Sequence, residues 1–285
     1  MTEPNHPIEV VETVVYPPLG ENLTLEPVGP DRFHAPTPGG SFGRLYGGLV
    51  GGQCLCAARI TAGREFLPDA LAVHFLRLGT PGPPLVIDVE RVRDGRSFMT
   101  RRFTASQDGD AIAVGLASFH VREPGWDWQP AAPDVSPPAG RARDPSAFNT
   151  VVVTPLDVVP AGARDEGGAL PLHPVWLRMQ EIAPDDDPGF HAAVLTYLSD
   201  LGLGQTARDL FAEVPAVGAT LNHSIWFHRP ARADRWLLLS SAADTIAGGR
   251  GLVRAALHAE DGTLLASIAQ EALLRPATSR PVPPP

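Results

Sequence analysis

The stretch GGLVGGQCLCAARITAG, residues 47–63, decides the expected fold because it is predicted to be the helix around which the first half of the chain is organised. Four runs that alternate apolar and polar residues follow it, which is the pattern of half-buried strands. They span residues 70–79, 84–95, 96–109 and 110–123, and a shorter strand pattern lies within residues 22–35. The first half is therefore expected to be one central helix wrapped by antiparallel strands.

The second half repeats this order. Strand patterns at 148–159 and 173–182 precede a helix pattern at 189–202, and further strand patterns follow at 219–230, 235–245, 251–262 and 263–276. The helix pattern carries its apolar residues on one stripe, as an amphipathic helix does. The stripe consists of Phe190, Val194, Leu195, Leu198 and Leu201.

Individual residues recur at a nearly constant spacing, which indicates a duplicated unit. Pairs of like residues lie 152 positions apart: Phe75 and Phe227, Arg77 and Arg229, and Leu85 and Leu237. Two Asp-Gly dipeptides, which favour hairpin turns, lie 153 positions apart at 108–109 and 261–262. Because strands follow one another through hairpins and not through helices, the expected fold class is α+β.

The duplication and the composition also give the expected domain boundaries. The first unit spans residues 1–122, and the second unit, which carries the candidate catalytic residues, spans 147–278. Between them, residues 123–146 are rich in proline and glycine, which is typical of a linker. The final segment, residues 279–285, is expected to be a disordered tail.

The composition of the 285 residues narrows the class of protein. A formal net charge of −9 disfavours non-specific binding to nucleic acid. No run of about 18 apolar residues predicts a membrane span, and the N-terminal residues lack the pattern of a signal peptide. Cys54 and Cys56 have no histidine nearby that would complete a zinc site. We therefore expect a cytoplasmic protein with no metal and two free thiols.

The string GGSFG, residues 39–43, matches the G-x-S-x-G pattern of a nucleophilic serine. That motif needs a strand before the serine and a helix directly after it. Here prolines precede Ser41, glycines follow it, and the sheet is expected to be antiparallel. We therefore expect Ser41 to lie in a glycine-rich loop and not to be catalytic.

Polar residues at unusual positions mark the second unit. Gln270 lies on an otherwise apolar strand face, so it either has a partner inside the fold or lines a site. Asp200 falls in the last turn of its helix, where the helix dipole disfavours a carboxylate and tends to raise its pKa, as suits a general base. Thr220, Asn222 and Ser224 alternate along one strand and are expected to share a face. The alternatives are an exposed Asp200 at a fraying helix end and a strand face wetted by solvent.

The first unit lacks equivalents of these groups. At an offset of 153 the counterpart of Gln270 is Ala117, and no Asp or Glu occurs between Gly48 and Arg64. The chain is therefore expected to carry a single set of catalytic groups.

Several motifs, in order, resemble type II acyl-CoA thioesterases, the bacterial thioesterase II family. They are YGGLVGGQCLCAAR, HFLRLG, RDGRSFMTRR, YLSD, ATLNHSIWFHRP, RGLVR and DGTLLASIAQEALLR. The resemblance implies a double hotdog fold, with two helix-in-sheet units in one chain. It also implies hydrolysis of acyl-CoA to a free carboxylic acid and CoA, without a cofactor, in fatty acid metabolism. By the same resemblance, Asp200, Thr220 and Gln270 would hold and activate the attacking water.

The sequence departs from the family pattern at two positions. Asn222 stands where the family commonly has aspartate, which would remove a negative charge near the base. Ala72 stands where the family has a histidine, which would alter the acyl pocket. Both departures bear on substrate preference and on the rate.

Further groups complete the expected mechanism. Backbone N–H groups at Gly47 and Gly48, at the start of the first helix, are expected to bind the carbonyl oxygen of the substrate. An arginine cluster in the first half is interpreted either as a solvated strand face or as a site for the CoA phosphates. It comprises Arg91, Arg93, Arg96, Arg101 and Arg102.

Two other functions are compatible with a hotdog fold. An enoyl-CoA hydratase needs a histidine close to its aspartate, and His191 lies nine residues from Asp200 on another face of the helix. A non-catalytic acyl-CoA-binding protein would keep the fold without the chemistry. Because hotdog units pack sheet to sheet, a homo-oligomer is also expected.

Overall fold

The computed structural model describes residues 18–38, 43–138, 156–162, 173–180, 187–208, 210 and 216–276. The expected loop at Ser41, the expected tail at 279–285 and the part of the expected linker from residue 139 onward lie outside these ranges. The domain boundaries expected for the two units, 1–122 and 147–278, stay predictions.

The described residues form one antiparallel sheet of 12 strands, in the order β1-β2-β4-β5-β6-β3-β9-β12-β11-β10-β8-β7. The first half of the chain supplies β1 (Glu26–Gly29), β2 (Arg32–Ala35), β3 (Leu67–Phe75), β4 (Leu85–Asp94), β5 (Phe98–Gln107) and β6 (Asp110–His120). The second half supplies β7 (Leu156–Pro160), β8 (Val175–Met179), β9 (Ala216–Phe227), β10 (Leu237–Ala247), β11 (Arg250–Ala259) and β12 (Leu264–Pro276). The order is symmetric about the β3–β9 junction, which confirms the duplication and the α+β class.

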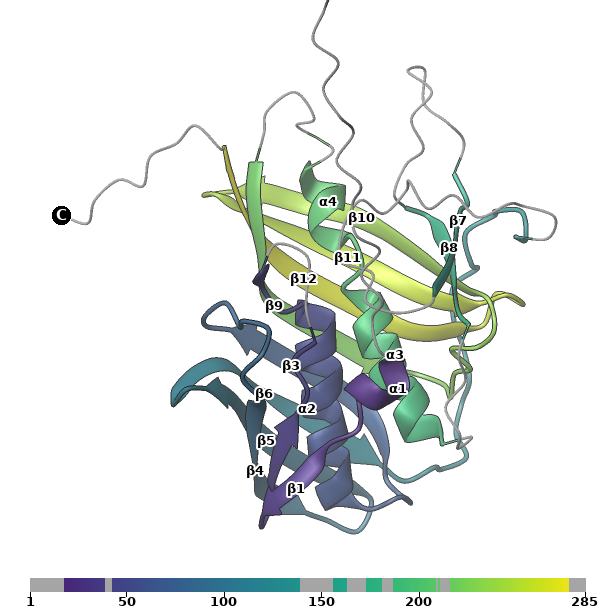
Figure 1. Cartoon of the computed structure of the whole chain (residues 1–285). Coiled ribbons are helices and arrows are strands. Elements are labelled where there is room, and N and C mark those ends of the chain that lie inside the picture. The colour runs from purple at the N-terminus through teal and green to yellow at the C-terminus, as the bar shows by residue number, and fades with distance from the viewer. Residues whose placement is uncertain are drawn as a thin grey trace, which may run out of the picture.

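The helices among the described residues are α1 (Leu19–Asn22), α2 (Gly47–Ala62), α3 (Pro188–Ser199) and α4 (Leu203–Arg208). The sequence predicts α2 and α3, the two long helices that lie against the sheet (Figure 1). It misses α1 and α4, which have 4 and 6 residues and are too short to show a hydrophobic period. None of the described helices is long and apolar enough to cross a membrane.

Helices α2 and α3 pack closely because α2 carries glycines where the two backbones approach. A Cβ atom on Gly48 would lie 2.5 Å from the Tyr197 carbonyl oxygen, and one on Gly52 would lie 3.0 Å from the Ala193 carbonyl oxygen. Only glycine leaves room for this approach. These contacts also show that the helices run in opposite directions, so the start of α2 meets the end of α3.

Most apolar side chains of α2 are buried between α3 and the sheet, in a core shared by both halves of the chain, whereas Ile60 is exposed. Cys54 and Cys56 belong to this helix and are free thiols, as expected. Burial raises the pKa of Cys56 to about 12. The thiol is therefore protonated near neutral pH and contributes as a small packing group.

The two halves meet where β3 pairs with β9, from Ala70 opposite Trp226 to His74 opposite Asn222. Both junction strands contain a β-bulge. In β3 the additional residue is Asp69, next to Ala70, and in β9 it is Leu221, next to Asn222. The bulges repeat the 152-residue offset, so they belong to the duplicated unit.

Candidate active site

A cavity of about 240 Å³ lies where β9 and β12 meet the start of α2 and the end of α3. Asp200, Thr220 and Gln270 all line it. They come from three elements, because Asp200 caps α3, Thr220 lies on β9 and Gln270 lies on β12. The fold thus brings the three candidate residues together in one place.

Asp200 is the C-cap residue of α3, and its carboxylate lies at the first turn of α2. The Gly48 N–H donates a hydrogen bond to Asp200 Oδ2 at 2.8 Å. The positive end of the α2 dipole therefore faces the carboxylate and opposes the unfavourable end of α3. Sequence reasoning gives only the unfavourable effect, because the favourable one comes from a helix that is distant in the chain.

Hydrogen bonds connect the three residues. The Thr220 hydroxyl donates to Asp200 Oδ1 at 3.2 Å, and Gln270 Nε2 donates to Thr220 Oγ1 at 3.3 Å. Asp200 is 7% exposed and Gln270 is 1% exposed. Each of these buried polar groups therefore has a partner, as burial requires.

The bulge in β9 aims Thr220 at this network. Thr220 is aligned with Ala272, whereas Asn222 is aligned with Glu271, so Leu221 is an additional residue between them. An additional residue shifts the alternation of side chains along a strand. Residues on either side of Leu221 therefore do not follow the simple odd–even rule.

Because of the bulge, the expectation that Thr220, Asn222 and Ser224 share a face is wrong. Thr220 and His223 both contact the Gln270 side chain on the inner face. The Asn222 amide instead donates to the Glu271 carboxylate, on the opposite face of the sheet, at 3.2 Å. Strict alternation would have sent Thr220 and His223 to different faces.

Burial is the largest influence on the Asp200 carboxyl group and raises its pKa above the usual value for aspartate. The charge that His223 can carry, the Gly48 N–H, and hydrogen bonds to Thr220 and Gln270 all oppose this increase. A carboxylate with a raised pKa accepts a proton more readily than an exposed aspartate does. The site therefore holds a base in a fixed orientation.

The two glycines at the start of α2 have different surroundings. The sequence predicts that the Gly48 N–H binds a substrate oxygen. In the structure this N–H donates to Asp200 instead, so it is not open to the substrate. Gly47 lines the cavity, and within the described ranges its N–H has no hydrogen-bond partner. A Cβ atom on Gly47 would lie 2.8 Å from Asp200 Oδ2 and 3.2 Å from the Phe75 ring.

Gly48→Ala is expected to lower both stability and activity. The added Cβ would lie 2.5 Å from the Tyr197 carbonyl oxygen and 2.7 Å from the Tyr46 ring, so α2 must move away from α3. Overpacking of this kind costs about 1–3 kcal/mol, which outweighs the gain of up to about 1 kcal/mol in helix propensity. We expect kcat to fall roughly 100-fold, because the α2 N-terminus moves relative to Asp200.

Thermal melting and a steady-state assay measure the two effects of Gly48→Ala. Gly125→Ala is the control, because a Cβ atom there meets nothing within 4 Å. A Gly48→Ala protein with wild-type melting temperature and kcat would show that the close helix contact does not position the carboxylate.

The remaining lining of the cavity is mostly apolar, with two arginines. The larger apolar side chains include Leu45, Val50, Phe75, Leu78, Ile112 and Leu273, the arginines are Arg44 and Arg77, and Gln205 is a further polar residue.

The five arginines singled out from the sequence do not line this cavity. Arg91 pairs with Asp31, and Arg102 pairs with Glu90, on the solvated side of the sheet. Arg101 has no exposed side-chain surface. A solvated strand face thus describes Arg91 and Arg102, and Arg101 belongs to the interior.

The two departures from the family pattern also lie outside the cavity. Asn222 faces the outer side of the sheet, as described above. Ala72 alternates with the buried Leu71 and Val73, so its methyl group points outward as well. The expectations that these residues alter the charge beside the base and the acyl pocket are therefore not met, because both belong to the other face of the sheet.

His223 is a site-adjacent residue that the sequence reasoning missed. It is 3% exposed and lies 2.7 Å from Gln270 Oε1 through its Nδ1 atom. Burial lowers its pKa, while the Asp200 charge and the Gln270 hydrogen bond raise it. An available indication was that His223 interrupts the apolar face that includes Ile225 and Phe227, as Gln270 does on its own strand.

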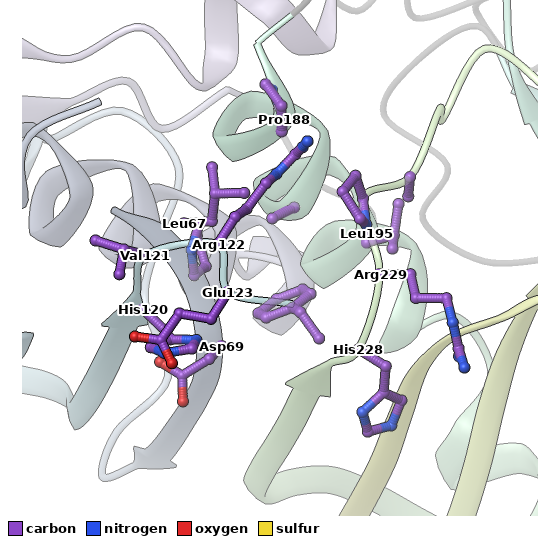
Figure 2. A pocket seen from close by; sticks show the side chains of 15 residues that line it. Leu67, Asp69, His120, Val121, Arg122, Glu123, Pro188, Leu195, His228 and Arg229 are labelled. Atoms are coloured by element: carbon purple, nitrogen blue, oxygen red, sulfur yellow. The ribbon is translucent and has the colours of Figure 1, made fainter. Parts of the chain in front are cut away.

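A second cavity, of about 330 Å³, occupies the corresponding position in the other half of the duplication. Figure 2 shows Asp69, His120 and Glu123 gathered on one side of it, with His228 and Arg229 on the other. The Ser118 hydroxyl donates to Asp69 Oδ2 at 2.8 Å, so this carboxylate already has a hydrogen-bond partner on the neighbouring strand β6.

The second cavity lacks the catalytic arrangement of the first. Strand pairing puts Leu71 and Ala117 where the other half has His223 and Gln270. Helix α2 ends in Gly63 at the place where α3 ends in Asp200. Among the described residues, no group of three or more His, Cys, Asp or Glu side chains could hold a metal ion.

The chain is similar to known proteins over most of its length. A family model described as "Acyl-CoA thioesterase N-terminal domain" matches residues 35–120, and one described as "Acyl-CoA thioesterase C-terminal domain" matches residues 129–274. Acyl-coenzyme A thioesterase 8 of Mus musculus is 33% identical over 281 residues, which cover 89% of this chain and 87% of the relative. Acyl-CoA thioesterase 2 of Haemophilus influenzae is 30% identical over 273 residues, which cover 89% of this chain and 95% of the relative.

Solved structures show the same architecture. The acyl-CoA thioesterase II TesB2 from Mycobacterium marinum superposes with a TM-score of 0.78 at 33% sequence identity and covers 91% of this chain and 99% of its own. The tesB protein of Mycobacterium avium subs paratuberculosis superposes with a TM-score of 0.77 at 26% identity and covers 90% of this chain and 98% of its own.

Proposed function

The chain belongs to the acyl-CoA thioesterase family and hydrolyses acyl-CoA, and from this premise we propose that Asp200 is the general base of the reaction. Asp200 takes a proton from water while the water oxygen attacks the thioester carbonyl carbon. The carbon–sulfur bond then breaks, and the sulfur takes the proton held by Asp200 and leaves as the CoA thiol, which restores the Asp200 carboxylate. The products are a free carboxylic acid and CoA.

Thr220 and Gln270 hold the attacking water beside the base. Their side chains line the same cavity as Asp200, to which Thr220 donates at 3.2 Å, while Gln270 donates to Thr220 at 3.3 Å. Fixing a reactant in this way removes much of the entropic cost of bringing it to the carbonyl carbon.

The Gly47 N–H stabilises the negative charge that develops on the carbonyl oxygen. This N–H lies at the start of α2, where the helix dipole favours an anion, and Gly47 lines the cavity. The neighbouring Gly48 N–H holds Asp200. In the first turn of α2, the Gly48 N–H thus binds the base, and the Gly47 N–H binds the carbonyl oxygen of the substrate.

The lining of the cavity suits the two ends of an acyl-CoA. The apolar group around Val50, Phe75 and Ile112 accommodates the acyl chain, because burying methylene groups is favourable by about 0.8 kcal/mol each. Arg44 and Arg77 provide positive charge for the phosphates of CoA. The single observation that carries the proposal is the buried Asp200 carboxylate at this cavity, with its raised pKa and its bonds to Gly48 and Thr220.

A pH profile of thiol release from saturated acyl-CoAs of increasing chain length tests this function. Asp200 must be ionised to act, so kcat is expected to fall as the pH drops through its pKa, which lies above the usual value of about 3.9. Thr220→Val removes a hydrogen bond that lowers this pKa, so the fall should move to higher pH. Its maximal kcat should be about 10–100-fold lower, because the water loses a positioning group.

Thr245→Val, at an exposed position of β10, is the matched control and should leave the pH profile unchanged. A Thr220→Val profile identical to that of the wild type would contradict the role of Asp200 as base. Binding of acyl-CoA without thiol release, or hydration of an enoyl-CoA without release, would contradict the hydrolytic function itself.

His191 does not complete a hydratase pair with Asp200. It lies near the opposite end of α3, where the Ala233 N–H donates to its Nδ1 atom at 3.4 Å. The expected homo-oligomer and the expected cytoplasmic location stay predictions.

A further inference from the structure

A buried histidine extends the hydrogen-bond network of the proposed active site away from the cavity. His223 Nδ1 lies 2.7 Å from Gln270 Oε1, and His223 Nε2 lies 2.8 Å from Ser199 Oγ. His223 is 3% exposed and Ser199 has no exposed surface. Neither residue lines the cavity. His223 therefore contacts the proposed site through Gln270, and its charge also influences Asp200.

Donor and acceptor chemistry fixes the direction of every bond between Asp200 and His223. An ionised carboxylate only accepts, so the Thr220 hydroxyl donates to Asp200 and its oxygen accepts from Gln270. The NH₂ group of Gln270 therefore faces Thr220, and its carbonyl oxygen faces His223. A carbonyl oxygen also only accepts, so His223 Nδ1 must carry a proton.

We propose that His223 is a positioning residue whose Nδ1–H holds the Gln270 amide in the orientation that lets Thr220 donate to Asp200. If the amide were reversed, its carbonyl oxygen would face Thr220. The Thr220 hydroxyl would then donate to Gln270, and Asp200 Oδ1 would lose its hydrogen bond. The inference rests on the proposed function, because it assumes that Asp200 is the base.

Ser199 lies beside the other ring nitrogen and accommodates a ring that is protonated on Nδ1. Burial favours the neutral imidazole, which has one N–H, although the Asp200 charge opposes this effect. The Ser199 hydroxyl can donate either to His223 Nε2 or to the Thr196 carbonyl oxygen, which lies 2.9 Å away. When Ser199 donates to Nε2, the proton of the neutral ring is on Nδ1. The chain of bonds then runs in one direction from Ser199 to Asp200.

Substitutions at His223 distinguish positioning from packing. His223→Leu removes the donor, and we expect kcat to fall about 10–100-fold with KM nearly unchanged. His223→Asn keeps an N–H near the place of Nδ1 and should retain most of the wild-type kcat. His258→Leu is the matched control, because His258 is also a buried histidine of the sheet, 4% exposed, and it does not contact Gln270.

A double-mutant cycle with Gln270→Met tests whether His223→Leu lowers kcat by way of the Gln270 amide. Once Gln270 is replaced, His223→Leu should lower kcat no further. Ser199→Ala, a smaller change, should lower kcat several-fold because the ring is then free to protonate Nε2. It provides the same test if His223→Leu fails to fold, as judged by circular dichroism.

Asp200→Asn, measured in parallel, separates failure of this inference from failure of the proposed function. If Asp200→Asn is inactive but His223→Leu keeps kcat within twofold of the wild type, the positioning role is wrong and the base assignment stands. Fully additive losses from His223→Leu and Gln270→Met would also overturn the positioning role. An active Asp200→Asn would instead overturn the base assignment on which the inference rests.

Discussion

Asp200→Asn is expected to lower kcat for acyl-CoA hydrolysis by about 10²–10⁴-fold, the usual contribution of a general base. The asparagine oxygen can still accept from the Gly48 N–H, which lies 2.8 Å from Asp200 Oδ2, so the start of α2 should not move. What is lost is the ability to accept a proton from water. Thiol release under saturating substrate measures the effect, and KM should change little.

The same substitution is expected to stabilise the protein at neutral pH. Burial raises the folded-state pKa of Asp200 above its unfolded value, so ionised Asp200 opposes folding at a pH above its folded-state pKa. Asparagine removes that cost. The gain in melting temperature should shrink as the pH falls through the raised pKa, and it should vanish below the unfolded value of about 3.9, where the wild-type carboxyl is protonated in both states.

Asp69→Asn is the matched control for both measurements. Asp69 is also a partly buried carboxyl group whose pKa is raised by burial, but it lines the second cavity. It should gain some stability at neutral pH and keep its wild-type kcat. If Asp200→Asn retained kcat within about tenfold of the wild type, or if Asp69→Asn lost as much activity, Asp200 would not be the base.

Arg101→Met is expected to destabilise the protein by roughly 3 kcal/mol and lower its melting temperature by about 5–10 °C. The Arg101 guanidinium is fully buried and donates to Thr61 Oγ1 at 2.8 Å, to the Thr61 carbonyl oxygen at 3.0 Å and to the Arg93 carbonyl oxygen at 3.0 Å. It also pairs with Asp94. Methionine fills part of the volume but leaves these acceptors without their donors, and each buried unsatisfied group costs about 1–3 kcal/mol.

Arg102→Met, at the next residue, is the control for this prediction. The Arg102 side chain is 63% exposed and pairs with Glu90 at the surface, and exposed pairs contribute at most about 1 kcal/mol. Denaturant unfolding of the two variants should therefore differ clearly. Similar losses for both would show that the interior bonds of Arg101 do not hold α2 against the sheet.

The fold was predictable because its main indications are local and occur twice. The apolar segment that becomes α2, the stripe of α3 and the alternating runs of the long strands each show their own period, and the 152-residue repeat shows that the two halves share one design. The Asp-Gly dipeptide at 108–109 forms the expected hairpin turn, with both residues at positive φ. Helices α1 and α4 were not predictable in this way, because neither is long enough to show a period.

Which residues could take part in the site was also readable from the chain. Gln270 on an apolar face and Asp200 at a helix end are out of place locally, and the resemblance added Thr220. The chain gave no indication of the bulge at Leu221, and strict alternation therefore assigned Thr220 to the same face as Asn222. His223 interrupts the apolar face that includes Ile225 and Phe227, and only the structure shows that it contacts Gln270.

The sequence by itself determined the two long helices, the long strands, the duplication and the residue types of the candidate site, because these depend on the period and spacing of neighbouring residues. Only the tertiary structure decided the environment of the carboxylate. Gly48 meets Asp200, 152 positions along the chain, because glycines let α2 approach α3. Burial, helix dipoles and hydrogen bonds act through space, so the pKa of Asp200 follows from contacts that no local pattern contains.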